Sequence, residues 1–155
     1  METLDDGIIR SSLLNDAGIV QATSTRLLGN MSIDRSQQGR ASGNFAAFME
    51  KLGINQAKSV ICILPAEHTS LIAHVVKKKA RGRIVLTNDR QGKEIKQWGK
   101  GDLFFQDKLP DYGQGTDAAV SKSKGLFLGF GHADCAPIML YDPESKFFAL
   151  VHAGI

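Results

Sequence analysis

The sequence predicts an α+β domain with a mixed, largely antiparallel β-sheet. Short β-branched and apolar runs outnumber helical patterns, and the two do not alternate strictly as they do in a doubly wound fold. The chain has 155 residues, of which 43% are hydrophobic and 23% charged, so it is large enough for one core. We therefore predict a single domain over residues 1–155, with sheet layers flanked by helices.

The N-terminal third predicts strands and turns followed by one helix. Residues 7–32 mix β-branched and polar side chains with glycines, which is typical of half-buried strands and turns. Apolar residues then recur at helical spacing over residues 44–52. Ser42 or Asn44 is suited to begin this helix, and Gly53 to end it.

Strands are expected to dominate the rest of the chain. The apolar run at 58–64 is typical of a buried strand, whereas the glycine-rich segment 88–115 predicts irregular structure. Further strands are expected over residues 71–76, 84–87, 116–120, 125–130, 138–141 and 147–152. The basic run at 77–83 lacks interleaved aromatic residues, so it predicts a solvated connection rather than a nucleic-acid contact.

Composition excludes several classes of protein. A net charge of +3 is too small to indicate nucleic-acid binding, and no apolar run approaches the length of a membrane span. The acidic start lacks the apolar segment of a signal peptide. Two cysteines, Cys62 and Cys135, do not form a disulfide framework, and Cys62 lies in an apolar run typical of the core. We expect a reduced, cytoplasmic protein.

Cys135 and His152 are predicted to meet at the open end of a β-hairpin. The turn sequence Asp-Pro-Glu-Ser separates two apolar runs. If Tyr141 pairs with Phe147, Ala136 lies opposite His152 and Cys135 is one residue away. Cross-strand neighbours have Cβ atoms about 4.5–5.5 Å apart and diagonal ones about 7–8 Å. This proximity suits either a shared metal ion or a nucleophile with its base.

A catalytic zinc site usually needs a third protein ligand. His74 lies inside an apolar strand, where a packed structural role is favoured. His68 follows a predicted strand, in a loop of the kind that carries function, and His132 lies three residues before Cys135. Spacing alone leaves both His68 and His132 open as the third ligand.

The C-terminal part of the chain contains a series of distinctive blocks. They are Thr116-Asp117-Ala118-Ala119-Val120, Gly125-Leu126-Phe127-Leu128, Ala133-Asp134-Cys135-Ala136-Pro137-Ile138, Tyr141-Asp142-Pro143 and Val151-His152-Ala153-Gly154. In order and spacing these blocks resemble the laccase-domain family, also called polyphenol oxidase-like, which is associated with purine nucleoside phosphorolysis. Upstream, Ser24 to Ser32, Asn44 to Ile54 and Glu67-His68 resemble the family's first turn, first helix and histidine segment. The family implies a layered α/β sandwich.

The resemblance implies a metal centre. The family's ligands are two histidines and one cysteine, which correspond here to His68, Cys135 and His152, so the resemblance favours His68 over His132. Zinc is the implied metal, with copper as a further possibility. Cys135, His68 and Asp134 would take part in catalysis, although the residue type of Asp134 slightly favours a turn residue bonded to local backbone amides.

The resemblance also implies an activity. It is zinc-dependent phosphorolysis of adenosine, inosine and methylthioadenosine, with deamination of adenosine as a side activity. Arg26 and Asn44 would bind substrate. The guanidinium of Arg26 suits phosphate or a ribose hydroxyl. The family continues past Gly154 with Trp-Arg-Gly, whereas this chain ends at Ile155, so we expect a C-terminally truncated piece. The alternatives are a metal-free cysteine hydrolase using Cys135 and His152, or an inactive fragment.

Overall fold

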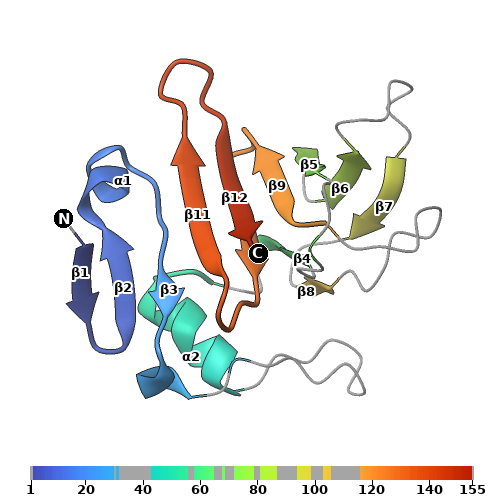
Figure 1. Ribbon diagram of the computed structural model, residues 1–155. Coiled ribbons are helices and arrows are strands. Elements are labelled where there is room, and N and C mark those ends of the chain that lie inside the picture. Colours follow the sequence, from blue (N-terminus) through green and yellow to red (C-terminus); the bar gives the residue numbers. More distant parts are fainter. Residues whose placement is uncertain are drawn as a thin grey trace. The chain divides into compact units, whose positions relative to one another are not determined.

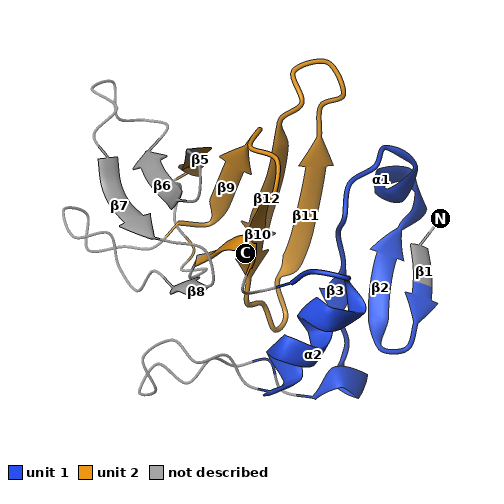
Figure 2. Ribbon diagram, turned by 180° about the vertical axis from the view of Figure 1, so that it is seen from behind, with its two compact units in different colours: residues 1–56 blue, residues 57–155 orange. Residues whose placement is uncertain are grey.

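The structure, a computed structural model, confirms the α+β fold class (Figure 1). It describes residues 2–29, 31, 43–55, 58–64, 68, 72–78, 81–86, 94–98, 103–105 and 116–154. Within this part of the chain the strands form three sheets, and helices are few and short. The chain divides into two compact units, unit 1 (residues 1–56) and unit 2 (residues 57–155), coloured blue and orange in Figure 2.

Unit 1 carries a small antiparallel sheet with the order β1-β2-β3. Its strands are β1 (Glu2–Asp5), β2 (Ile8–Ser11) and β3 (Thr23–Ser24), joined by α1 (Ser12–Asp16) and followed by the 3₁₀ helix η1 (Arg26–Leu28). The prediction of only strands and turns over residues 7–32 was wrong for α1 and η1. A hydroxyl caps each of them: Ser11 accepts from the Leu14 N–H at 3.4 Å, and Thr25 from the Leu27 N–H at 3.3 Å.

The predicted helix is confirmed as α2 (Gly43–Lys51). Phe45 and Met49 are buried, as expected for residues four apart on one helix face. Gly53 ends the helix as predicted, with a φ of 68° that a glycine adopts without strain. Asn44 lies inside the helix rather than capping it, and Ser42 lies outside the described residues. No described helix is long and apolar enough to cross a membrane.

Unit 2 contains two sheets of different character. A parallel sheet has the order β10-β4-β8, and a mixed six-stranded sheet has the order β11-β12-β9-β5-β6-β7. In the mixed sheet only the β5–β9 pair is parallel among the pairings described. The strands are β4 (Val60–Leu64), β5 (Ile72–Lys78), β6 (Arg81–Leu86), β7 (Glu94–Trp98), β8 (Leu103–Phe105), β9 (Ala118–Ser121), β10 (Leu126–Phe130), β11 (Ala136–Tyr141) and β12 (Phe148–Ala153).

The hydrophobic core of unit 2 contains side chains from both of its sheets. It is made of Val60 and Cys62 from β4, Leu126 from β10, Ala73 and Val75 from β5, and Ala119 from β9. The parallel sheet therefore packs on the mixed one, and this explains why β4 reads as an unbroken apolar run. Cys62 is fully buried, and burial raises the pKa of its thiol, so its assignment to the core is confirmed.

Four strands include residues for which the sequence predicted irregular structure or a solvated connection. β7 and β8 lie within 88–115, and β5 and β6 include basic residues of the run 77–83. Strand pairing explains the second difference, because a strand can carry a long basic side chain whose charged end reaches a polar group. Lys77 shows this, since its Nζ donates to the carbonyl oxygens of Lys124 and Gly125 at 3.0 and 3.1 Å.

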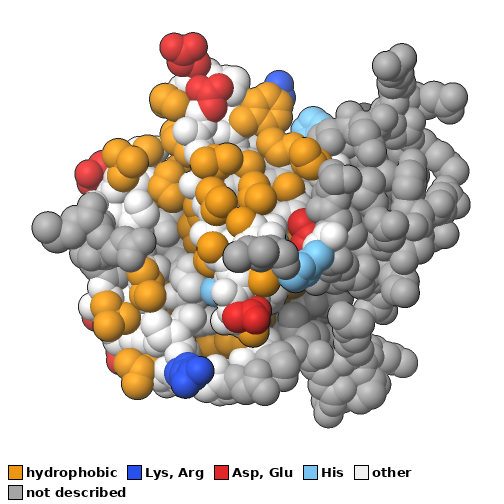
Figure 3. Space-filling model, in the orientation of Figure 1, with side chains coloured by type: hydrophobic (Ala, Val, Ile, Leu, Met, Phe, Trp, Pro, Cys, Tyr) orange, Lys and Arg blue, Asp and Glu red, His pale blue; other side chains and the backbone are white. Residues whose placement is uncertain are grey.

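β11 is an edge strand of the mixed sheet, and its side chains alternate between two environments. Ile138 and Leu140 are 42% and 56% exposed, whereas Pro137 and Met139, which alternate with them, are half-buried. Figure 3 shows hydrophobic side chains gathered over the β11–β12 hairpin. This alternation follows the two-residue period of a strand, and it identifies the inner face of β11 as the one that carries Pro137.

The hairpin register differs from the predicted one by one residue. Tyr141 pairs with Phe148 instead of Phe147, and His152 lies opposite Pro137 instead of Ala136. The cause is the turn, where Lys146 takes a left-handed conformation with a φ of 61° and adds one residue to the loop. Two bonds close this loop: the N–H of residue 142 donates to the carbonyl of 147 at 2.8 Å, and that of 146 to the carbonyl of 142 at 2.9 Å.

Candidate functional site

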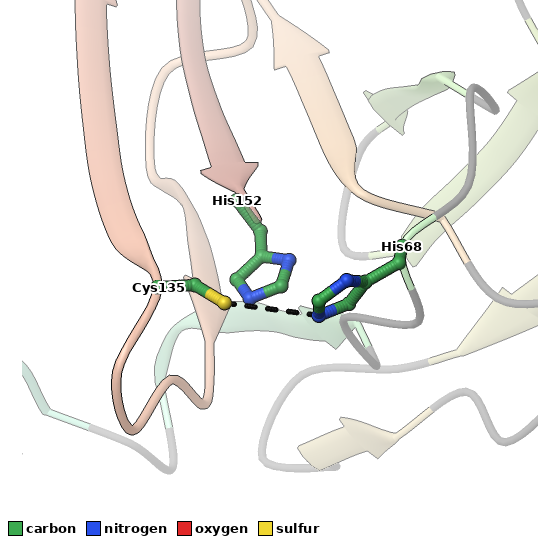
Figure 4. A group of neighbouring side chains, drawn as sticks. All are labelled: His68, Cys135 and His152. Atoms are coloured by element: carbon green, nitrogen blue, oxygen red, sulfur yellow. Dashed lines mark hydrogen bonds between the residues drawn. The ribbon is translucent and has the colours of Figure 1, made fainter. Parts of the chain in front are cut away.

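Three side chains predicted to act together lie side by side in unit 2 (Figure 4). They are His68 from the connection between β4 and β5, Cys135 just before β11, and His152 near the end of β12. One potential ligand atom from each lies within 4.8 Å of the other two, and Cys135 Sγ is 3.7 Å from His68 Nε2. The group combines one thiol with two imidazoles, a donor set that suits zinc or copper.

The hairpin register places Cys135 and His152 on the same face. His152 pairs with Pro137, and Cys135 lies two residues before Pro137, so all three side chains project to one side. Cys135 is thus a diagonal neighbour of His152. In the predicted register the thiol would have faced the other side of the sheet, because a slip of one residue reverses every side chain.

His68 reaches the group from a separate segment and in an unusual backbone conformation. Its φ is 56°, in the left-handed region that residues other than glycine, asparagine and aspartate rarely adopt. Its N–H donates to Asp117 Oδ1 at 2.9 Å, and its ring lies edge-on to the His152 ring, with centroids 5.2 Å apart. A strained backbone held by a buried carboxylate is a feature that functional sites often carry.

The surroundings of Cys135 disfavour its thiolate when no cation is near. Partial burial raises the pKa of the Cys135 thiol, and so do the hydrogen bond from Sγ to Asp134 Oδ1 at 3.6 Å and the negative charges of Asp134 and Asp117. A metal ion reverses this balance, because a coordinated thiol loses its proton. The surroundings therefore favour the protonated thiol without a cation and the thiolate when a metal ion is bound.

The other predicted site residues lie in different places. Asp134 is exposed beside Cys135, and His132 is exposed and is not one of the three converging residues. Arg26 begins η1 and Asn44 lies in α2, so both belong to unit 1. Within that unit the Asn44 amide lies against Gly29: a Cβ on Gly29 would be 2.6 Å from Asn44 Nδ2.

Asp117 is a site residue that sequence reasoning missed. It is 5% exposed, and its Oδ1 accepts from His152 Nδ1 at 2.7 Å as well as from the His68 backbone. The sequence offered one signal, a lone acidic residue directly before an apolar strand. Nothing local showed that this strand would pair with the one that carries His152.

Comparison with known proteins gives the chain a family context. The sequence profile described as multi-copper polyphenol oxidoreductase laccase matches residues 18–155, which is most of the chain. The match covers most of unit 1 and all of unit 2, and it takes in all three converging residues.

Two curated proteins are similar over short segments. The chain is 42% identical over 41 residues to a protein named adenosine deaminase RL5, from an unknown prokaryotic organism. It is 40% identical over 47 residues to a purine nucleoside phosphorylase of Deinococcus radiodurans. These segments are 26% and 30% of this chain, and the chain spans only 16% and 18% of the lengths of those relatives.

Proposed function

The chain belongs to the multi-copper polyphenol oxidoreductase laccase family, and we propose that it is the zinc-binding part of a purine nucleoside phosphorylase. Purine nucleosides and phosphate are the proposed substrates, with deamination of adenosine as a second reaction at the same site. The observation that carries the proposal is the convergence of His68, Cys135 and His152. The names of the two similar proteins, a phosphorylase and an adenosine deaminase, support the choice of substrates.

The distance between Cys135 and His68 fits zinc. Bond lengths of about 2.3 Å to sulfur and 2.0–2.1 Å to nitrogen, at a tetrahedral angle, separate the two ligand atoms by about 3.6 Å. Cys135 Sγ and His68 Nε2 are 3.7 Å apart. Three protein ligands also leave the fourth position of a tetrahedral ion for water or substrate, which is the usual arrangement of catalytic zinc.

The histidine content argues against several copper ions, despite the family's description. The whole chain has four histidines, and two of them belong to the converging group. Of the others, His74 lies on β5 with its ring 6.0 Å from that of Phe147, and burial lowers its pKa. One metal ion at one site is therefore the occupancy that we propose.

The chemistry divides between the metal and the chain's own groups. Zinc at this site would act as a Lewis acid and lower the pKa of a water molecule to about 7. The hydrogen bond from Cys135 Sγ to Asp134 Oδ1, at 3.6 Å, supports a role for this carboxylate in proton transfer. We propose that it would take the thiol proton on metal binding and exchange protons with substrate.

In the proposed phosphorolysis, a phosphate oxygen bonds to C1′ of the ribose while the bond from C1′ to the purine nitrogen breaks. The purine leaves with the electron pair and takes up a proton, and ribose 1-phosphate is the other product. Positive charge develops on the sugar, so positioned anions supply much of the acceleration. In the deamination, water adds at C6 of adenosine and ammonia leaves, giving inosine.

We assign phosphate and ribose recognition to Arg26 and Asn44. A guanidinium forms paired hydrogen bonds with phosphate or vicinal hydroxyls, and an amide can donate and accept. The contact of Asn44 with Gly29, at the end of the short helix that Arg26 begins, supports a common role, because it brings the two residues to neighbouring parts of unit 1.

Metal analysis combined with turnover tests the proposal. The chain should contain about one zinc ion, convert adenosine to adenine and ribose 1-phosphate only when phosphate is present, and form inosine without it. Cys135→Ala should lose the zinc and both reactions. Cys62→Ala, which removes the other thiol from the core, should keep the zinc. Zinc binding without turnover of any nucleoside would refute the proposed substrates for this chain.

A metal-free cysteine hydrolase is the second candidate. The 2.7 Å contact of Asp117 with His152 favours it, because nucleophile–base pairs often have the base oriented by a third group. The raised pKa of Cys135 opposes it, since reactive thiols have lowered pKa values. A metal-free protein that hydrolyses esters or amides and loses this activity on alkylation of Cys135 would favour the hydrolase.

A further inference from the structure

Asp117 lies at the point where β9 and β12 bring the two histidine segments together. Val151 of β12 pairs with Ala118 of β9, so the next positions along the ladder, His152 and Asp117, lie opposite each other. The backbone bond from the N–H of His152 to the carbonyl of Asp117, at 2.7 Å, continues this ladder. Asp117 is 5% exposed and His152 8%, so the pair is shielded from water.

One carboxylate oxygen of Asp117 contacts both histidines. Its Oδ1 lies 2.7 Å from His152 Nδ1 and 2.9 Å from the backbone nitrogen of His68. An ionised carboxylate has no hydrogen to donate, so the hydrogen of the first contact is on Nδ1 of His152. The lone pair of the neutral ring is then on Nε2, the nitrogen that remains for a ligand.

The second contact acts on the backbone of His68. This residue has a φ of 56°, which the chain does not adopt readily without a compensating interaction. The bond from its N–H to Asp117 supplies such an interaction, and the conformation directs the ring so that Nε2 is 3.7 Å from Cys135 Sγ. The same oxygen thus sets the tautomer of one imidazole and the direction of the other.

We propose that Asp117 is the positioning residue of this site, and that it presents the Nε2 atoms of His68 and His152 to a metal ion bound with Cys135. The part of this inference that concerns the metal rests on the proposed function. The part that concerns the tautomer of His152 holds for the metal-free protein.

Three variants of the full chain test the proposal: Asp117→Ala, Asp117→Asn and Ser121→Ala. The asparagine keeps an oxygen that can accept both bonds and keeps the side-chain volume, so this variant should fold if the alanine variant does not. Ser121 is a matched control on the same strand. It is fully buried, and its hydroxyl accepts a hydrogen bond from the Ser123 N–H at 3.1 Å. Its removal therefore costs a buried polar contact away from the histidines.

The first measurement is nitrogen-15 NMR of the imidazole rings in the metal-free protein, at a pH above the ordinary histidine pKa of about 6.5. The signal of His152 is identified by its loss in His152→Gln. We expect Nδ1 to carry the hydrogen in the unaltered chain, in Asp117→Asn and in Ser121→Ala. Asp117→Ala should shift His152 toward the other tautomer. An unchanged tautomer in Asp117→Ala would overturn the proposal.

The second measurement is zinc affinity, by competition with a chromophoric chelator. Removing such an outer partner of a ligand weakens metal binding by about 10- to 100-fold, and we expect this loss in Asp117→Ala. Asp117→Asn should recover part of it, and Ser121→Ala should bind as the unaltered chain does. An equal loss in Ser121→Ala would show a general structural effect and overturn the proposal. If the unaltered chain binds no zinc but Asp117→Ala still changes the tautomer, the proposed function fails and the positioning role stands.

Discussion

At the scale of single residues, Gly154 determines how closely the chain can pass the His68 ring. A Cβ at this position would lie 2.7 Å from His68 Cε1 and 3.0 Å from both ring nitrogens. A larger residue at this position would therefore displace the ring of a proposed ligand. By contrast, a Cβ on Gly131 would contact nothing within 4 Å.

Gly154→Ala is expected to move the His68 ring and to weaken zinc binding by about tenfold, as displacement of a ligand from its preferred geometry does. The melting temperature of the metal-free protein should change little, because an exposed side chain such as His68 can turn aside. Chelator competition and thermal melts measure the two effects. Gly131→Ala is the matched control, and equal affinities for the two variants would contradict the prediction.

At the scale of elements, the turn of the β11–β12 hairpin sets which residues face the site. Asp142 organises this turn: its side chain accepts from the Glu144 N–H at 2.9 Å and from the Ser145 hydroxyl. The hydrogen bond from Ser145, with that from Glu144, lowers the pKa of the Asp142 carboxyl. The charged form of Asp142 is thus the form that favours the folded turn.

A group whose pKa is lower in the folded state stabilises the fold above its unfolded pKa, here about 3.9, and loses this contribution as the pH falls through the folded value. Asp142→Asn should therefore lower the melting temperature at pH 7, and the difference from the unaltered chain should shrink in acid below about pH 4. Glu144→Gln removes a charge from the same turn and serves as the control. A difference for Asp142→Asn that is constant with pH would contradict this assignment.

At the scale of the whole molecule, the proposed metal site links segments that are distant in the sequence. His68 and Cys135 are 67 positions apart in the sequence. Cys135 directly precedes β11, and His152 lies near the end of β12. An ion bound by all three would connect the β4–β5 connection to the hairpin. Such an ion binds the folded state much better than the unfolded one, so it stabilises the fold.

Zinc at 100 times its dissociation constant should stabilise the protein by about 2.7 kcal/mol. For a chain of this length, that corresponds to a rise in melting temperature of about 5–10 °C. Thermal melts with added zinc, and again after a chelator, measure the change. Cys135→Ala should show no rise, and an equal rise in that variant would place the stabilising ion elsewhere.

Much of the fold was predictable because its signals are local. The helix over Gly43–Lys51 has helical spacing of apolar residues and a terminal glycine, and the strand Val60–Leu64 is an unbroken apolar run. α1, β7 and β8 were missed, since short elements carry weak patterns and depend on capping or on pairing with distant strands. The single domain remains a prediction.

The sequence by itself determined the hairpin, the donor types and the placement of Cys135 and His152 at one end of that hairpin. It could do so because turn residues and strand periodicity act over a few positions. Only the tertiary structure decided the register, which Lys146 shifts by one residue, and the face on which Cys135 lies. It also decided that Asp117 bonds to both histidines, because that contact depends on three segments meeting across β9 and β12, and no local pattern encodes such a meeting.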